Sequence, residues 1–73
     1  MRYQILAIIP STDENKIQTI RSLLGGYGEM EQHKDGNKML LKFDSRFPDY
    51  TNLFKRKVLA RFPEASFRER ERE

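Results

Sequence analysis

Tyr3-Gln4-Ile5-Leu6-Ala7-Ile8-Ile9 is the stretch of this sequence that decides the fold. Both of its alternating sets of side chains are apolar or nearly so, unlike any other run in the chain. Such β-branched runs are typical of a central strand that is covered on one face and partly covered on the other. Pro10 ends the strand, because proline has no amide hydrogen to donate to a neighbour. The rest of the chain must therefore supply the cover.

The length and composition indicate one small domain. A chain of 73 residues buries only about 60% of its unfolded surface. The absence of cysteine excludes disulfides and thiolate zinc sites and favours a cytoplasmic protein. No apolar run approaches the roughly 20 residues of a membrane span, and we expect no signal peptide. The 14 basic and 11 acidic residues give a net charge of +3, without the single-sign patch typical of duplex-DNA binders.

A first helix is predicted from about Thr12 to Leu24. Ser11 and Glu14 form a capping box, in which each side chain satisfies an exposed amide at the start of the helix. The Gly25-Gly26 pair is expected to end the helix with a residue in the left-handed conformation. The apolar stripe has helical spacing and comprises Ile17, Ile20, Leu23 and Leu24.

A hairpin is predicted to follow. Residues 27–34 resemble a polar edge strand, Asp35-Gly36-Asn37 is a strong turn signal, and residues 38–44 form the next strand. We expect Asp35-Gly36 to be the two turn residues. The register that follows, with apolar pairs on one face and opposite charges on the other, places Lys34 opposite Asn37, Met30 opposite Leu41, and Glu29 opposite Lys42.

A second helix and a short last strand complete the expected elements. Pro48 suits the first turn of a helix that begins near residues 45–49, and Pro63 ends it. Residues 65–68 can add a short edge strand, and residues 69–73 form a charged tail without apolar content. We therefore expect a domain over residues 1–68 and a tail over residues 69–73. The helix stripe is Tyr50, Phe54, Val58 and Phe62.

The order β-α-β-β-α-β predicts an α+β fold, the ferredoxin-like two-layer sandwich. Its four-stranded antiparallel sheet should have the order 4-1-3-2, with both helices on one face. The two most apolar strands are then central, and the polar strands lie at the edges. A three-stranded sheet with a disordered tail is the alternative.

No motif points to catalysis, a cofactor or a metal site. The Gly25–Gly28 run follows a helix end, where carbonyls repel anions, so it is interpreted as a turn and not as a phosphate loop. His33 is the only histidine, and it is expected to be solvated on an edge strand. No pair of carboxylates has a spacing that demands proximity. We therefore predict a protein that is not an enzyme.

Two known families share the expected element order. The RNA-recognition motif stacks bases on aromatic side chains of its first and third strands; here Tyr3 and Phe43 are the only aromatic residues of those strands. The chain also resembles, in order and length, the small CRISPR-adaptation nucleases and related antitoxin-type ribonucleases. That resemblance implies a metal-dependent nuclease, in which an Asp closes the first strand. Here the strand closes with Ile9 and Pro10.

Two surfaces are candidates for binding. The first is the face of the sheet that the helices leave uncovered, hereafter the open face. There we expect an apolar patch of Leu6, Ile8 and Leu40, with a charged rim of Glu29, Glu31, His33 and Lys42. The second is the basic side of the second helix, which could bind nucleic acid or an acidic partner and comprises Lys55, Arg56, Lys57 and Arg61.

The function we predict is regulation through binding. A mildly basic small chain without a cofactor signal is typical of regulators and inhibitors encoded by phages or accessory genes. The expected partner is a large complex, with a nucleic-acid-processing machine such as RNA polymerase as the predicted class. A homodimer through the open face is a further possibility. Direct nucleic-acid binding by the second helix is the alternative function, and a metal-dependent nuclease is the third.

Overall fold

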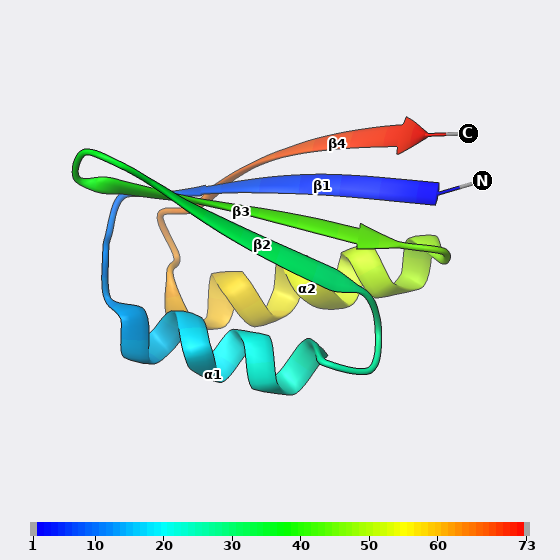
Figure 1. Cartoon of the computed structure of the whole chain (residues 1–73), viewed down its shortest axis with the longest axis horizontal. Helices are drawn as coiled ribbons and strands as arrows, with labels where there is room; N and C mark the ends of the chain where they lie inside the picture. Colours follow the sequence, from blue (N-terminus) through cyan, green and yellow to red (C-terminus); the bar gives the residue numbers. More distant parts are fainter. Residues whose placement is uncertain (1, 73) are drawn as a thin grey trace.

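The computed structural model describes the backbone of residues 2–72 and the side chains of residues 2–69, arranged as a sheet covered by two helices (Figure 1). The predicted order β-α-β-β-α-β is confirmed. The elements are β1 Arg2–Ile9, α1 Glu14–Leu24, β2 Glu29–Asp35, β3 Lys38–Ser45, α2 Pro48–Arg61 and β4 Ser66–Arg72.

The four strands form one sheet in the order β2-β3-β1-β4. This is the predicted order 4-1-3-2 counted from the other edge, and every neighbouring pair is antiparallel. Both helices lie against the same face, as expected (Figure 1). The two strands with the most apolar sequences, β1 and β3, occupy the centre, because only central strands can bury that much apolar surface.

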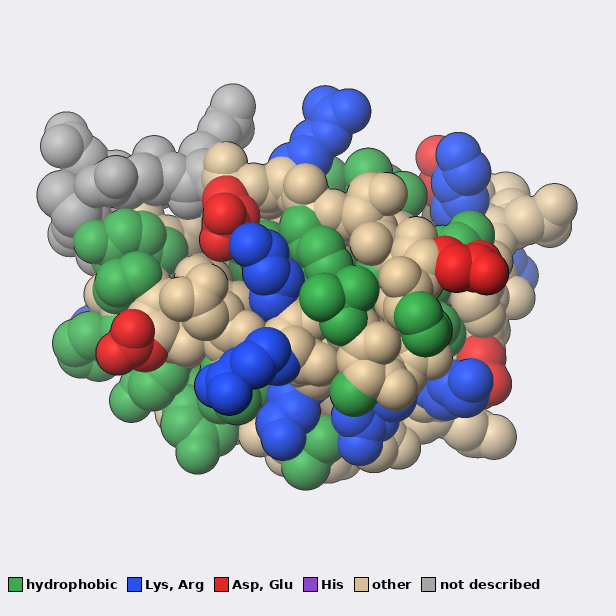
Figure 2. Space-filling view, turned by 180° about the vertical axis from the view of Figure 1, so that it is seen from behind, with side chains coloured by type: hydrophobic (Ala, Val, Ile, Leu, Met, Phe, Trp, Pro, Cys, Tyr) green, Lys and Arg blue, Asp and Glu red, His purple; other side chains and the backbone are tan. Residues whose placement is uncertain are grey.

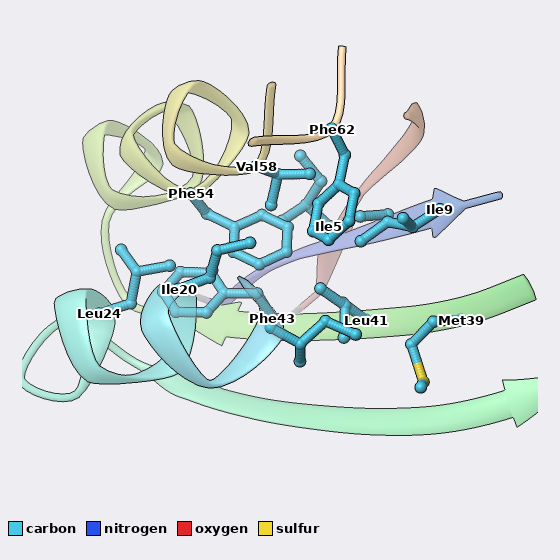
Figure 3. Close-up of a cluster of buried hydrophobic side chains, with 12 residues drawn as sticks. Ile5, Ile9, Ile20, Leu24, Met39, Leu41, Phe43, Phe54, Val58 and Phe62 are labelled. Carbon is cyan, nitrogen blue, oxygen red and sulfur yellow. The ribbon is translucent and has the colours of Figure 1, made fainter. Parts of the chain in front are cut away.

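The core lies between the sheet and the helices (Figure 3). Alternate side chains of β1 and β3 point into it, so that Ile5 and Phe43 are fully buried while Leu6 and Lys42 are not. The ring of Phe43 stacks on that of Phe54 from α2, with centroids 4.9 Å apart and ring planes 5° from parallel. The buried apolar residues are Ile5, Ala7, Ile9, Ile17, Ile20, Leu24, Met39, Leu41, Phe43, Phe54, Val58 and Phe62.

Helix α1 begins at Glu14, later than the predicted Thr12, and its N-cap is Asp13 and not Ser11. The Asp13 carboxylate accepts a hydrogen bond from the amide of Lys16 at 3.3 Å. Ser11 lies before the N-cap, and its hydroxyl accepts a hydrogen bond from the amide of Asp13 at 3.3 Å. The carboxylate is the better cap because it satisfies an exposed amide and also places negative charge at the positive end of the helix dipole.

The end of α1 also differs from the prediction. Gly25 has φ −57°, in the right-handed region, and Gly36 is the only described residue with positive φ. The amide of Tyr27 donates to the carbonyl of Leu24 at 3.0 Å. A turn bond thus ends the helix, and no left-handed glycine is required.

The register of the β2–β3 hairpin corrects the predicted one. Asp35 pairs with Lys38, so Gly36 and Asn37 are the turn residues. Gly36 takes φ 62° and Asn37 does not have positive φ, which is the pattern of a type II′ turn with glycine first. The observed pairing of β2 with β3 is shifted by two residues from the predicted pairing. Every side chain therefore stays on the face of the sheet that was predicted for it. The observed pairs are Met30 with Phe43, Glu29 with Asp44, and Glu31 with Lys42.

Strand β4 is longer than predicted. It pairs with β1 from Ser66 opposite Ile8 to Arg72 opposite Arg2. Residues 69–72, predicted as a charged tail, therefore continue the strand; Glu73 lies outside the described residues. The physical reason is the long β1 strand, whose second edge would otherwise leave its amides and carbonyls unpaired.

Candidate functional site

Two neighbouring rows of residues on the open face run across all four strands of the sheet. Backbone pairing aligns alternate residues of each strand, and the helices cover only the other set. One row runs from β2 to β4 through Glu31, Lys42, Leu6 and Arg68. The next row runs in the same direction through His33, Leu40, Ile8 and Ser66.

The three apolar residues predicted for this surface and the rim residue Lys42 lie together on adjacent strands. Ile8 pairs with Leu40, and Leu6 pairs with Lys42. All four side chains are half-buried, because their neighbours on the sheet partly cover them. The apolar part of the open face is therefore a compact strip over the two central strands.

Charged groups border this strip on the β2 side. The Glu31 carboxylate lies 4.0 Å from the ammonium of Lys42 and 3.7 Å from Nε2 of His33. Glu29 and Asp35 are exposed on the same edge strand. Ion pairs as exposed as these contribute little to stability, so the carboxylates remain available to a cationic partner.

Arg68 borders the strip on the β4 side, a position that the sequence analysis missed. Its side chain is exposed and its backbone pairs with Leu6. A depression of about 390 Å³ is lined there by Gln4, Leu6, Arg68 and Glu69. The alternation of Arg and Glu after Phe67 was the available signal, since a strand with that pattern presents one sign of charge to each face.

The basic residues predicted on α2 do not converge on one surface. At about 100° per residue, Lys55 lies on one flank of the helix, Arg56 points outward, and Lys57 with Arg61 lies on the other flank. Lys55 is 3.4 Å from the carboxylate of Glu69. Arg61 donates to the carbonyl of Lys57 at 3.3 Å. Figure 2 shows Lys and Arg side chains in a loose band over the helical layer, with apolar and acidic side chains among them.

A second hollow lies where β3 leads into α2. Its volume is about 460 Å³, and its lining includes the rings of Tyr27, Phe47 and Tyr50. Tyr50 meets the other two edge to face, at centroid distances of 4.9 and 5.3 Å. Arg2 and Glu29 also line it, so no single charge dominates the hollow.

The described part of the chain contains no group of three or more His, Cys, Asp or Glu residues placed to hold a metal ion. His33 has Glu31 beside it but no further such residue. Among the same residues, no helix is long and apolar enough to cross a membrane.

Comparisons with known proteins identify the fold. No protein-family model matches the sequence, and no curated protein matches it. Among solved structures, the designed protein Ferredog-Diesel has a TM-score of 0.75 at 6% identity, over 97% of this chain and 85% of that one.

Two natural proteins with solved structures are also similar. A putative antibiotic biosynthesis monooxygenase from Chloroflexus aurantiacus has a TM-score of 0.69 at 9% identity, over 100% of this chain and 94% of that one. The divalent cation tolerance protein of Thermus thermophilus has a TM-score of 0.61 at 17% identity, over 99% of this chain and 84% of that one. At these identities the likeness establishes a ferredoxin-like fold and nothing about activity.

Proposed function

We propose that this protein is a non-enzymatic regulator that binds a larger macromolecular partner through the open face of its sheet. The observation that carries the proposal is the strip of Leu6, Ile8 and Leu40 between two charged edges. An apolar centre with a polar border is the usual composition of a protein-binding surface. The partner class that we propose is a nucleic-acid-processing machine such as RNA polymerase.

The charges around the strip support a protein partner. Glu31 and Arg68 stand at opposite ends of one row. A surface with both signs of charge can orient a protein partner and exclude wrong ones. A nucleic-acid backbone, by contrast, would be repelled by the carboxylates of β2. The open face therefore suits a partner with its own pattern of charged and apolar groups.

The experiment is affinity capture from host cells with identification of the bound proteins by mass spectrometry. Leu6→Asp places a charge in the centre of the strip and should abolish capture of the specific partner. Leu59→Asp is the matched control, because Leu59 is 40% exposed on α2, in the helical layer. Both variants are first checked for folding by circular dichroism. Equal capture by wild type and folded Leu6→Asp would refute the proposal.

Direct nucleic-acid binding by α2 is the second candidate. It is favoured by the number of cations on that helix and by the outward position of Arg56. It predicts an affinity that falls steeply as salt is raised, and that falls again in the Lys55→Glu, Arg56→Glu double variant. Nucleic-acid binding that is unchanged in the double variant would exclude this candidate.

A further inference from the structure

The open face has acid at one edge and base at the other. The β2 edge presents three exposed carboxylates on this face, those of Glu29, Glu31 and Asp35. The β4 edge presents the exposed guanidinium of Arg68, and two later positions of that strand are also arginines. The apolar strip lies between the two edges.

We propose that a second copy of this chain covers the open face, with β2 of each copy over β4 of the other. The arrangement follows from symmetry. A two-fold axis that runs along the strand direction between β1 and β3 exchanges the two edges of the sheet and keeps the rows aligned. A surface whose opposite edges carry opposite charges is self-complementary under that rotation, as a two-fold interface requires.

Each row of the open face then lies opposite the same row of the second copy, so that Lys42 of one copy lies opposite Leu6 of the other. Glu31 of one copy lies opposite Arg68 of the other, and the same contact occurs a second time by symmetry. In the next row Leu40 of one copy lies opposite Ile8 of the other. Packed sheets are about 10 Å apart, which leaves room for these side chains to meet. The depression beside Leu6 and Arg68 leaves space for the β2 side chains of the second copy.

The alternative two-fold arrangement is disfavoured by charge. If the axis ran across the strands, β2 would lie over β2 and would bring the Glu29 and Glu31 carboxylates of both copies together. Like charges placed opposite each other at an interface strongly weaken association. The charge pattern thus selects one of the two orientations.

Self-association in this form would regulate the binding proposed above. The inference rests on the proposed function in one respect, because the covered face is the one that the larger partner needs. The free protein would then be a dimer with its binding surface hidden, and the larger partner would compete with the second copy. A domain of this size also gains stability when a second copy binds its folded form.

The test is sedimentation equilibrium of the whole chain over a range of concentrations, with charge-reversed variants. Glu31→Arg and Arg68→Glu should each weaken the dimer about tenfold or more, since each creates two like-charge contacts. The double variant should recover the wild-type dimer. Within one chain the two residues are three strands apart, roughly 14 Å, so recovery can only come from pairing between copies.

Two control variants make the same charge reversals at positions away from the open face. Arg56→Glu lies on the outer side of α2, and Glu64→Arg lies in the exposed turn before β4; neither should change the dimer. The folding of all variants is compared by circular dichroism. If Glu31→Arg or Arg68→Glu fails to fold, Glu31→Lys and Arg68→Asp replace them.

Three results would overturn the inference: a wild-type chain that stays monomeric at all concentrations, single variants that dimerise as the wild type does, or a double variant that does not recover. Each of these would leave the proposed function intact if Leu6→Asp still lost its partner. Conversely, a confirmed dimer together with normal capture by Leu6→Asp would refute the proposed function alone.

Discussion

Gly28 occupies a position at the start of β2 where a side chain has no room. A Cβ atom there would overlap the backbone carbonyl of Asp44 and would lie 2.7 Å from Cζ of Phe43. The carbonyl belongs to a paired strand and cannot move without breaking the sheet. The close approach of β2 to β3 at this end therefore depends on glycine.

Gly28→Ala is accordingly expected to lower the free energy of unfolding by about 1–3 kcal/mol, the usual cost of overpacking. Gly26→Ala is the control, since a Cβ at Gly26 meets nothing within 4 Å and should have little effect. Urea unfolding of the two variants makes the comparison. Equal stability of both would contradict the close approach.

Phe54 is one of the buried residues that pack α2 against the sheet. It is fully buried, stacks on Phe43, and meets the Phe67 ring edge to face at 6.5 Å. Phe54→Ala should cost about 3–5 kcal/mol, whereas truncation of the exposed Leu59 on the same helix should change stability by about 0.5 kcal/mol or less. Thermal unfolding would show whether the two substitutions differ in this way.

The burial of a core residue was predictable from the sequence where the alternation within one strand decides which face of the sheet the residue occupies. The alternation in residues 3–9 and 39–43 assigned Ile5 and Phe43 to the core, and both are buried. The stacking of Phe43 on Phe54 was not predictable, because it depends on where a helix lies over a sheet. Sequence periodicity gives the face of a residue but not its partner in another element.

At the scale of elements, the hairpin offers a direct test of its register. Gly36→Ala should cost about 1–2 kcal/mol, because φ is +62° there and alanine is strained in that region. Asp35→Ala should cost little, since Asp35 is a strand residue paired with Lys38. A turn at Asp35-Gly36 would instead make both substitutions costly. The melting temperatures of the two variants distinguish the registers.

The start of α1 provides a second test. Asp13→Ala removes the acceptor of the Lys16 amide and should cost about 0.5–2 kcal/mol. Ser11→Ala should cost less, because its hydroxyl accepts from the amide of Asp13 outside the helix. Chemical denaturation followed by circular dichroism measures both. A larger loss of stability for Ser11→Ala than for Asp13→Ala would support the predicted capping box instead.

These two elements show why type and order were predictable while boundaries were not. Two neighbouring pairs, Asp35-Gly36 and Gly36-Asn37, both resemble hairpin turns, and both Ser11 and Asp13 can cap a helix. The two turn positions, and likewise the two N-caps, differ little in local free energy. Tertiary packing therefore decides which of them forms. For the open face, the alternation placed Leu6, Ile8 and Leu40. Arg68 was missed because the pairing of β4 depends on β1, more than fifty residues away in sequence.

At the scale of the molecule, β4 completes the sheet. Removal of residues 69–73 should lower stability by roughly 2–4 kcal/mol, since several strand hydrogen bonds to β1 are lost at about 0.5–1.5 kcal/mol each. Lys55→Ala is the control: it removes the half-exposed ion pair with Glu69, worth at most about 1 kcal/mol, and the contact of the ammonium with the Phe67 ring, but no strand hydrogen bond. A disordered tail would predict no change on truncation, so urea unfolding of the shortened chain decides between strand and tail.

The pairing of β1 with β4 also governs the order of events when the chain folds. Ladder contacts such as Arg2 with Arg72 join opposite ends of the described chain, as the adjacent N and C marks show (Figure 1). Closing so long a loop costs conformational entropy before the strand contacts form. The β1–β4 pairing should therefore form late in folding, and the β2–β3 hairpin early. During synthesis, β1 must remain exposed on one edge until β4 has left the ribosome. A chaperone or a like strand could occupy that edge in the interval.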